Sequence, residues 1–138
     1  MKAMITILAV VLGVSYCLAD IINIPDDFET IQAGIDSAEE ADTVLVQPGV
    51  YVENIDFDGH NIVVGSLFIT TEDTAYVDRT IIDGDSSDSV VQFGSRETEA
   101  AELSGFTLRN GFAILGGGIF IRDASPTLSH LVISGNWA

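Results

Sequence analysis

The chain has 138 residues, enough for a single domain. It carries 21 acidic residues against five basic ones, a formal charge of −16 at pH 7. Such an excess of acid repels nucleic acids and anionic membrane surfaces, so we expect neither as a partner. A polyanionic polysaccharide is disfavoured for the same reason unless a divalent cation bridges it to the protein. The simplest interpretation is a solvated acidic surface that keeps the protein soluble.

The first 19 residues are typical of a secretory signal peptide. Lys2 precedes an apolar run over residues 4–14, and the small residue Ala19 offers a cleavage site. An uncleaved membrane anchor is disfavoured because the run is short for a bilayer and no basic cluster follows it. Lipidation of Cys17 is a further alternative, disfavoured by the bulky residue before it. We therefore expect residues 1–19 to be removed and the exported chain, secreted or at the cell surface, to have no membrane span.

Cleavage after Ala19 would also remove the only cysteine, so no disulfide could stabilise the exported chain. It would remove Lys2, the only lysine, and lower the formal charge from −16 to −17. Stability must then come from side-chain packing and from pairing of backbone groups.

One amphipathic helix is expected over residues 24–42, IPDDFETIQAGIDSAEEAD. Its apolar residues recur at helical spacing and share one face: Phe28, Ile31, Ile35 and Ala38. Asp26 and Glu29 stand at the spacing of an N-terminal capping box. No later segment shows a period near 3.6 over a useful length.

Beyond this helix the sequence is β-like, in short strands that each run into a turn containing Gly, often beside Asn, Asp or Pro. The segments are TVLVQPG (43–49), NIVVGS (61–66), TIIDGD (80–85), FTLRNG (106–111) and LVISGN (131–136). Their last inward apolar residues, 18 to 26 residues apart, are expected to be Val46, Val64, Ile82, Leu108 and Ile133. Further apolar segments between them give each period more than one strand.

Similar strand and turn units at this spacing predict a solenoid. Several strands per turn would coil into a parallel β-helix whose equivalent strands stack about 4.8 Å apart. Val64, Ile82, Leu108 and Ile133 are then expected in one inward stack, with the N-terminal helix covering the first rung. A β-sandwich, which also has many short strands, is the alternative; the repeated turns and the helix favour the solenoid.

Residues 24–66 resemble the opening of right-handed parallel β-helix proteins of the pectin lyase-like superfamily. The motifs that carry the resemblance are Thr30-Ile31-Gln32, Asp42-Thr43-Val44, Pro48-Gly49 and Tyr51-Val52-Glu53-Asn54. The later stretch, from DRTIIDGD to LVISGN, resembles the repeats of large secreted bacterial β-helix proteins. The resemblance implies an all-β fold, a right-handed parallel β-helix with a short N-terminal capping α-helix.

The resemblance is specific for the fold and weak for activity. In pectin methylesterases of this superfamily, the piece that Gly49, Tyr51 and Glu53 match shapes the first rungs and carries no chemistry. The paired Asp and Arg motifs of those esterases are not recognisable in the 138 residues, nor are the Asp clusters of polygalacturonases or the Arg motif of the lyases. No catalytic residue is therefore assigned.

The densest acidic turn is DGDSSD, residues 83–88. Its carboxylates, on Asp83, Asp85 and Asp88, are candidate ligands for Ca²⁺, a cation that takes six to eight oxygens. The helix-loop-helix calcium signature is not met, because Gly94 stands where that loop needs Glu. A solvated polar loop is the simpler interpretation, and no cofactor is required.

Aromatic side chains are the candidates for binding carbohydrate, because their flat faces stack on sugar rings. Trp137, just beyond the last turn, and Tyr51 are the two candidates for such a surface, and Tyr76 and Phe112 are further possibilities. Packing of these rings inside the coil is the alternative.

Four polar residues sit at strand starts in the repeats. Ser104 and Ser129 occupy the same place in two copies of the repeat, and we expect them to form a stacked polar ladder. His130 takes the place that Gly105 holds in the previous repeat, which suggests a tolerant outward position, and neither His60 nor His130 is expected to be a metal ligand.

The last repeat ends at Asn136, and no polar cap or closing helix follows it within the sequence. An open rung would expose apolar side chains and unpaired backbone groups. We therefore expect residues 20–138 to be the N-terminal cap and first rungs of a longer β-helix domain.

Two functions remain open. The first is a secreted or cell-surface β-helix repeat protein with a binding or structural role, toward polysaccharide or other cell-surface components. The second is the N-terminal part of a polysaccharide-active enzyme, similar to a pectate lyase, polygalacturonase or pectin esterase, whose catalytic residues lie beyond residue 138. Fold alone does not choose between them. We expect no catalysis from the 138 residues themselves.

Overall fold

The computed structural model describes residues 18–138, so the predicted signal peptide falls almost wholly outside the described residues. The described chain consists mainly of short strands and turns. Its elements in chain order are β1 (Ile21–Ile24), α2 (Ile31–Ser37), β2 (Thr43–Val46), β3 (Gly49–Val52), β4 (Ile55–Asp56), β5 (Val63–Ser66), α3 (Phe68–Thr71), α4 (Ala75–Arg79), β6 (Thr80–Asp83), β7 (Val91–Phe93), β8 (Glu102–Ser104), β9 (Thr107–Arg109), β10 (Ile119–Ile121), β11 (Thr127–Ser129) and β12 (Val132–Ile133).

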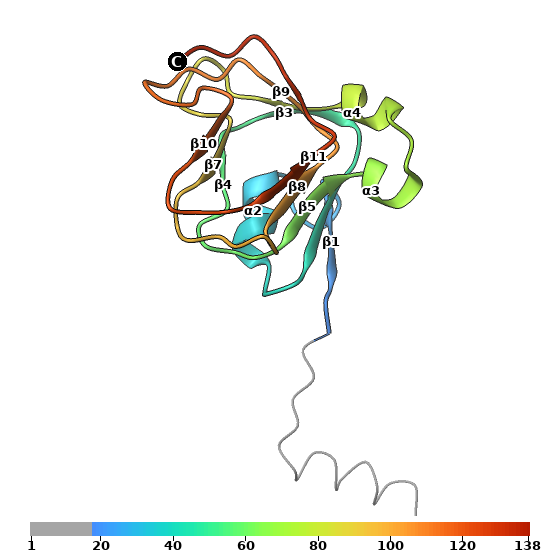
Figure 1. Cartoon of the computed structure of the whole chain (residues 1–138). Coiled ribbons are helices and arrows are strands. Elements are labelled where there is room, and N and C mark those ends of the chain that lie inside the picture. Colours follow the sequence, from blue (N-terminus) through green and yellow to red (C-terminus); the bar gives the residue numbers. More distant parts are fainter. Residues whose placement is uncertain (1–17) are drawn as a thin grey trace, which may run out of the picture.

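The strands form three sheets in which every ladder is parallel. Sheet A has the order β1-β2-β5-β8-β11, sheet B β12-β9-β6-β3 and sheet C β10-β7-β4. From β2 onward the chain visits sheets A, B and C in turn and then repeats the circuit. Figure 1 shows the sheets as three walls around one interior. The arrangement is predominantly β and fits the predicted parallel solenoid.

The register stacks two similar segments that lie 25 residues apart, LSGFTLRNG (103–111) and LSHLVISGN (128–136). Leu103 lies opposite Leu128 in sheet A, and Leu108 lies opposite Ile133 in sheet B. The hydroxyls of Ser104 and Ser129 are 2.8 Å apart, which confirms the predicted polar ladder. Homologous sequence positions therefore stack on adjacent rungs.

The prediction of a single inward stack is wrong at Val64. Ile82, Leu108 and Ile133 do lie in register in sheet B, but Val64 lies in sheet A, between Val44 and Leu103. The segments 61–66 and 80–85 lie on successive sides of one rung. Gly65 and Ser66 stand inside β5 and pair in sheet A, whereas Gly84 follows the end of β6. A shared pattern of apolar strand and Gly turn therefore does not reveal which wall a strand belongs to.

The interior is filled by aliphatic and phenylalanine side chains from all three sheets. The rings of Phe57 and Phe93 lie with their centroids 4.3 Å apart at 33°. The fully buried apolar residues include Ile24, Ile31, Ile35, Val44, Val64, Ile82, Leu103, Phe106 and Leu108. Burial of this kind is the main stabilising contribution in a fold without disulfides.

Several turn residues have left-handed backbone. Asp88, Asn110 and Asp123 have φ near +50°, and Gly135 has φ +66°. Asn and Asp tolerate this conformation better than other residues with a Cβ, and Gly adopts it freely. Among the glycines of the five repeated segments, Gly135 has this conformation, whereas Gly65, Gly84 and Gly111 do not.

The N-terminal helix is shorter than predicted. It spans α2 alone, and Thr30 is its N-cap, with Oγ1 accepting from the backbone N–H of Ala33 at 3.1 Å. The capping box of Asp26 and Glu29 is therefore wrong. Before the helix the chain pairs as β1 and then turns, a turn that Asp27 closes by accepting from the N–H of Asn23. Ile31 and Ile35 are buried as predicted, whereas Phe28 is exposed.

Two residues of the resemblance motifs fix α2 to the first rung. The carboxylate of Glu53 accepts from the backbone N–H groups of Ile31 and Gln32, at 3.0 and 2.9 Å. The side-chain amide of Gln32 bonds both backbone groups of Asp56, accepting from its N–H at 2.7 Å and donating to its C=O at 2.9 Å. The Gln32 amide thus makes the two hydrogen bonds with Asp56 that the backbone of a neighbouring strand would otherwise make beside β4.

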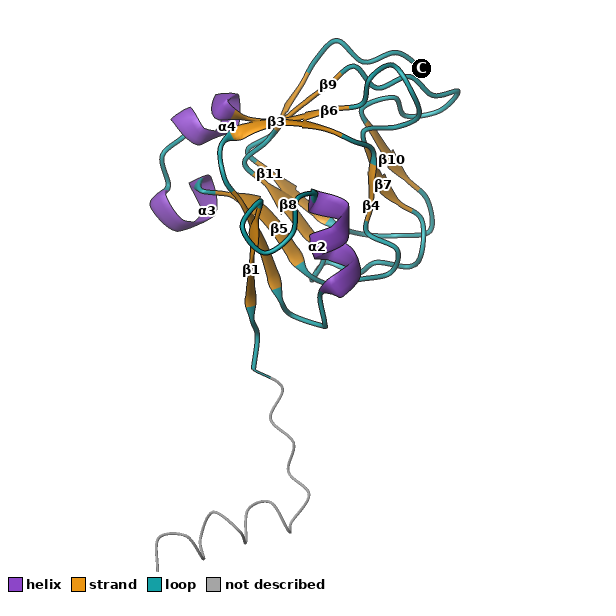
Figure 2. Cartoon of the chain, turned by 180° about the vertical axis from the view of Figure 1, so that it is seen from behind, coloured by secondary structure: helices purple, strands orange, loops and turns teal. Residues whose placement is uncertain are grey.

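An insertion between β5 and β6 carries two single-turn helices, α3 and α4, which the sequence did not predict. They are only four and five residues long, too short to show a helical period. Thr107 ties the insertion to sheet B by donating its hydroxyl to the C=O of Val77 at 2.8 Å. Figure 2 shows both helices outside the three walls. Within residues 18–138 no helix is long and apolar enough to cross a bilayer.

Candidate functional site

The outer face of sheet C carries a row of residues in register. Asp56 lies opposite Gln92, and Gln92 lies opposite Phe120. Their strand neighbours Ile55 and Val91 are buried inside the coil. Because side chains alternate across a strand, these three residues project from the outer face.

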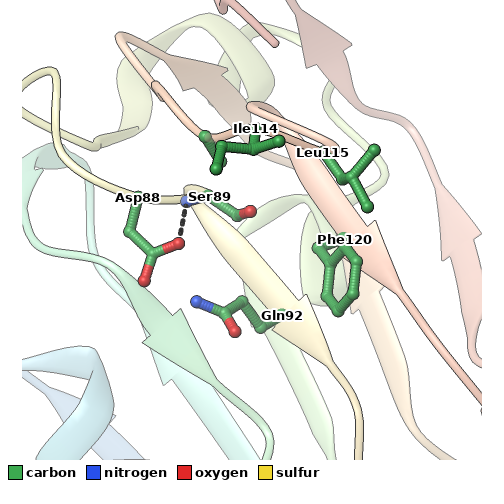
Figure 3. Close-up of a pocket in the computed structure, with 7 residues that line it drawn as sticks. Asp88, Ser89, Gln92, Ile114, Leu115 and Phe120 are labelled. Carbon is green, nitrogen blue, oxygen red and sulfur yellow. Dashed lines mark hydrogen bonds between the residues drawn. The ribbon is translucent and has the colours of Figure 1, made fainter.

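A loop between β9 and β10 rises beside this row. Its residues Ala113, Ile114 and Leu115 line an open pocket of about 480 Å³ together with residues of sheet C and the turn before it. Those partners are Asp88, Ser89, Gln92 and Phe120. Figure 3 shows the loop side chains and the strand side chains facing the same hollow. Ile114 is 94% exposed, an unusual position for a large aliphatic side chain.

The loop is anchored by backbone bonds. The N–H of Phe112 donates to the C=O of Asp88 at 2.9 Å, and the N–H of Ala113 donates to the C=O of Trp137 at 3.2 Å. The Asp88 carboxylate accepts from the N–H of Ser89 at 2.8 Å. These bonds thus hold the aliphatic side chains of the loop over the polar residues of the pocket.

This combination of groups suits an uncharged polar ligand with an apolar face. Phe120 and Leu115 offer apolar contact, and the amide of Gln92 both donates and accepts hydrogen bonds. The carboxylate of Asp88 is a further acceptor. Sugar rings have this character, with hydroxyls around the edge and C–H groups on the face.

Asp83, the first residue of the acidic turn, has its carboxylate engaged. One oxygen accepts from Arg109 Nε and from Asn110 Nδ2, both at 2.9 Å, and the other accepts from the N–H of Asp85 at 3.0 Å. Burial alone would raise the pKa of Asp83. The hydrogen bonds from Asp85, Arg109 and Asn110 outweigh that effect and hold the pKa below its ordinary value.

The other two residues of the calcium prediction, Asp85 and Asp88, are exposed on the turn with φ near +50°. Among residues 18–138 no group of three or more His, Cys, Asp or Glu side chains is placed so that it could hold a metal ion. The calcium site at Asp83, Asp85 and Asp88 therefore stays a prediction, with the first of the three already used in structural hydrogen bonds.

The two aromatic candidates are not brought together. Tyr51 lies in β3 and packs against the core, with its hydroxyl donating to the C=O of Gln47 at 2.8 Å. Burial raises the pKa of Tyr51, and the charges of Glu53 and Asp26 add to the shift. Trp137 is 72% exposed on the last rung, in a bridge with Phe112. Trp137 is thus at the base of the loop that lines the pocket.

The two histidines occupy different surroundings. His60 lines a shallow hollow with Glu39, Glu40 and Asp58. The ring of His130 lies against Phe68 of the insertion, with centroids 4.1 Å apart. His130 is exposed, as predicted, and one side of its ring packs against the insertion.

Several residues of the site could not be identified from the sequence pattern. The only signal for the pocket was the apolar run Phe112 to Leu115, which stands in a loop between strands. Glu97 carried no signal, although its carboxylate is buried and accepts from the N–H groups of Gly59 and Ser95, each at 3.0 Å. These contacts make Glu97 a structural residue at the corner between β7 and β8.

Comparison with protein-family models found no match, and comparison with curated proteins found no significant similarity.

Proposed function

We propose that this protein is an exported right-handed parallel β-helix repeat protein of the pectin lyase-like kind, and that it binds polysaccharide on the outer face of sheet C. The observation that carries the proposal is the row Asp56, Gln92 and Phe120, in register beneath an apolar loop. The resemblance of residues 24–66 and the signal peptide support the fold and the export.

The direction of the row supports an extended ligand. Neighbouring parallel strands lie about 4.8 Å apart, so three rungs place three side chains in a line along the coil. A ligand that repeats along its own length can contact each rung in the same way. Phe120 would stack on one sugar ring while Gln92 bonds the hydroxyls of the next.

The charge of this face favours a neutral polysaccharide. Asp56 and Asp88 both lie on it, so a polymer of uronic acids would meet like charge. Ca²⁺ could bridge a polyuronate to these carboxylates. Neutral glycans should therefore bind without added cations, and acidic ones only with Ca²⁺.

Calorimetric titration with neutral glycans, pectate and methylated pectin, each with and without Ca²⁺, tests the proposal. Phe120→Ala should weaken binding about twofold to twelvefold, since aromatic contacts contribute about 0.5–1.5 kcal/mol. Val50→Ala, on the exposed face of β3, is the matched control and should leave binding unchanged. Absence of binding to every glycan, or equal binding by the Phe120→Ala variant, would overturn the proposal.

The alternative function is the N-terminal part of a polysaccharide-active enzyme, and it rests on the same resemblance. The buried carboxylates of Asp42, Asp83 and Glu97 accept backbone or side-chain hydrogen bonds that hold turns in place. Turnover of pectate or methylated pectin by the native protein, with none by residues 20–138 alone, would favour the enzyme over the binding protein.

A further inference from the structure

The sequence contains a single Asn-Gly step, Asn110-Gly111, in the turn that follows β9. Asn is a thermolabile residue, and a following glycine makes it most reactive because no side chain hinders the backbone nitrogen. That nitrogen attacks the side-chain carbonyl carbon of Asn110, and the side-chain nitrogen leaves as ammonia with the proton of the Gly111 N–H. Water then opens the five-membered imide at either carbonyl, which leaves aspartate or isoaspartate.

Asn110 is exposed to the water that this reaction needs, but the attacking nitrogen is engaged. The N–H of Gly111, a buried residue, donates to Oδ1 of Asn136 at 2.7 Å. Asn136 is itself fixed, because its amide donates to the C=O groups of Leu108 and Ser134 at 3.0 and 3.2 Å. The Gly111 nitrogen can therefore attack only after this hydrogen bond has broken.

The other polar groups of Asn110 are bonded as well. Its Nδ2 donates to Oδ2 of Asp83 at 2.9 Å, its backbone N–H donates to the C=O of Gly135 at 3.2 Å, and its C=O accepts from the N–H of Ser86 at 2.8 Å. These bonds restrict rotation of the side chain toward the Gly111 nitrogen. The turn thus has to open locally before the imide can form.

The glycines of the two Asp-Gly steps, Gly59 and Gly84, are engaged in the same way. The N–H of Gly59 donates to Oε1 of the buried Glu97 at 3.0 Å, and the N–H of Gly84 donates to the C=O of Arg109 at 2.9 Å. Aspartate before glycine forms the same imide with loss of water. Every Asn-Gly and Asp-Gly step of the sequence therefore has its attacking nitrogen in a hydrogen bond.

We propose that Asn110 is a latent deamidation site, which the hydrogen bond from Gly111 to Asn136 keeps unreactive in the folded protein. Its product would loosen the corner between sheets B and C. A carboxylate at position 110 has no donor for Asp83, so two like charges would face each other where the amide now bonds. Isoaspartate adds a methylene to the backbone beside Gly111, where even an added Cβ would stand 1.8 Å from the carbonyl oxygen of Gly117.

Peptide mapping by mass spectrometry tests the proposal on the exported protein, kept for weeks in mildly alkaline buffer. Folded wild type should deamidate at Asn110 at least about ten times more slowly than the same chain unfolded in urea, because the turn opens only locally. Asn136→Ala should speed the reaction in the folded state about twofold to twelvefold, the factor that corresponds to one hydrogen bond. Asn136→Asp keeps an acceptor for the Gly111 N–H and should stay close to wild type.

Ser104→Ala is the matched control, because it removes a hydrogen bond from a different wall and should leave the rate at Asn110 unchanged. Equal acceleration by Asn136→Ala and Ser104→Ala would mean that global unfolding limits the reaction, and it would overturn the proposal. No acceleration by Asn136→Ala would overturn it too. The comparison of folded with unfolded wild type needs no variant, and equal rates in the two states would also refute the proposal.

Asn110→Asp tests the consequence of the reaction. At neutral pH this variant should lower the unfolding midpoint in urea more than Asn110→Gly does. The glycine variant loses the same amide, adopts the positive φ of position 110 freely and carries no charge. An equal or larger loss in Asn110→Gly would show that the carboxylate does not act through Asp83.

Discussion

Glu53 caps a helix that lies 21 residues earlier in the chain, accepting from the backbone N–H of Gln32 at 2.9 Å. Its second oxygen accepts from the N–H of Ile31 at 3.0 Å. The first N–H groups of a helix have no partner within the helix, and a carboxylate there also complements the helix dipole. One side chain thus joins the first rung to the element that closes it.

Glu53→Ala should therefore lower the free energy of unfolding by about 1.5–3 kcal/mol, the usual contribution of hydrogen bonds to a charged group. Urea denaturation measures the change. Glu40→Ala removes an exposed carboxylate near the same end and should change the free energy by less than about 0.5 kcal/mol. Equal effects of the two substitutions would show that the Glu53 contacts contribute nothing specific.

Gln32→Ala should destabilise the chain because both backbone groups of Asp56 lose their partner. Unpaired backbone groups of this kind cost about 1–3 kcal/mol when water does not replace the bond. Gln32→Glu keeps an acceptor for the Asp56 N–H and loses the donor to its C=O. In urea denaturation, Gln32→Glu should therefore lower the free energy of unfolding less than Gln32→Ala does. The reverse order would contradict these roles of the Gln32 amide.

Stability should fall in acid through Asp42 and Asp83. Hydrogen bonds from the N–H groups of Asp20 and Glu39 lower the pKa of Asp42, and those described above lower the pKa of Asp83. A carboxyl whose pKa is lower when folded adds stability above its ordinary pKa of 3.8 and loses it as pH falls through the folded value.

The measurement is the unfolding midpoint in urea between neutral pH and strong acid. Asp83→Asn should reduce stability near pH 7 and flatten its dependence on pH below pH 4. A variant that keeps the wild-type slope in acid would show that another group causes the dependence. Asp85→Asn, on the exposed part of the same turn, is the control.

Gly111→Ala should be strongly destabilising. A Cβ at Gly111 would stand 1.8 Å from the carbonyl oxygen of Gly117, a backbone atom that cannot rotate away. Overpacking of this kind costs about 1–3 kcal/mol and occasionally more. Gly94→Ala is the matched control, because nothing lies within 4 Å of its added Cβ. Thermal unfolding should separate the two variants clearly, and similar midpoints would contradict the close approach of these turns.

The paired serines should be coupled. Ser104→Ala leaves the hydroxyl of Ser129 without its 2.8 Å partner and should cost about 0.5–1.5 kcal/mol. The double substitution with Ser129→Ala should cost less than the sum of the single ones. Strict additivity in this double-mutant cycle would show that the ladder hydrogen bond has no energetic role.

The repeated pattern of apolar strand and polar turn was sufficient to predict parallel, stacked β structure, because both the 25-residue spacing and the Gly and Asn turns are local features. The pattern was not sufficient to assign Val64 to a sheet, because strands of all three sheets show the same alternation of apolar and polar residues. Only pairing across rungs assigns a strand to a wall, and the sequence does not display that pairing.

The pocket was the least predictable part. Gln92 and Phe120 become neighbours only through the register of β7 with β10, and the insertion lengths between rungs are irregular. Trp137 could be predicted as an exposed aromatic because it follows a turn, whereas the burial of Tyr51 depends on its packing against the core. Residues that act through rung-to-rung contacts leave little trace in a single sequence.

The most direct test of a glycan site on sheet C is an NMR titration of residues 20–138 with a neutral oligosaccharide. The account predicts that amide signals of Ser89, Gln92, Leu115 and Phe120 shift together with one dissociation constant, while those of α2 do not move. Absence of shifts with every neutral glycan, or shifts confined to another sheet, would contradict it.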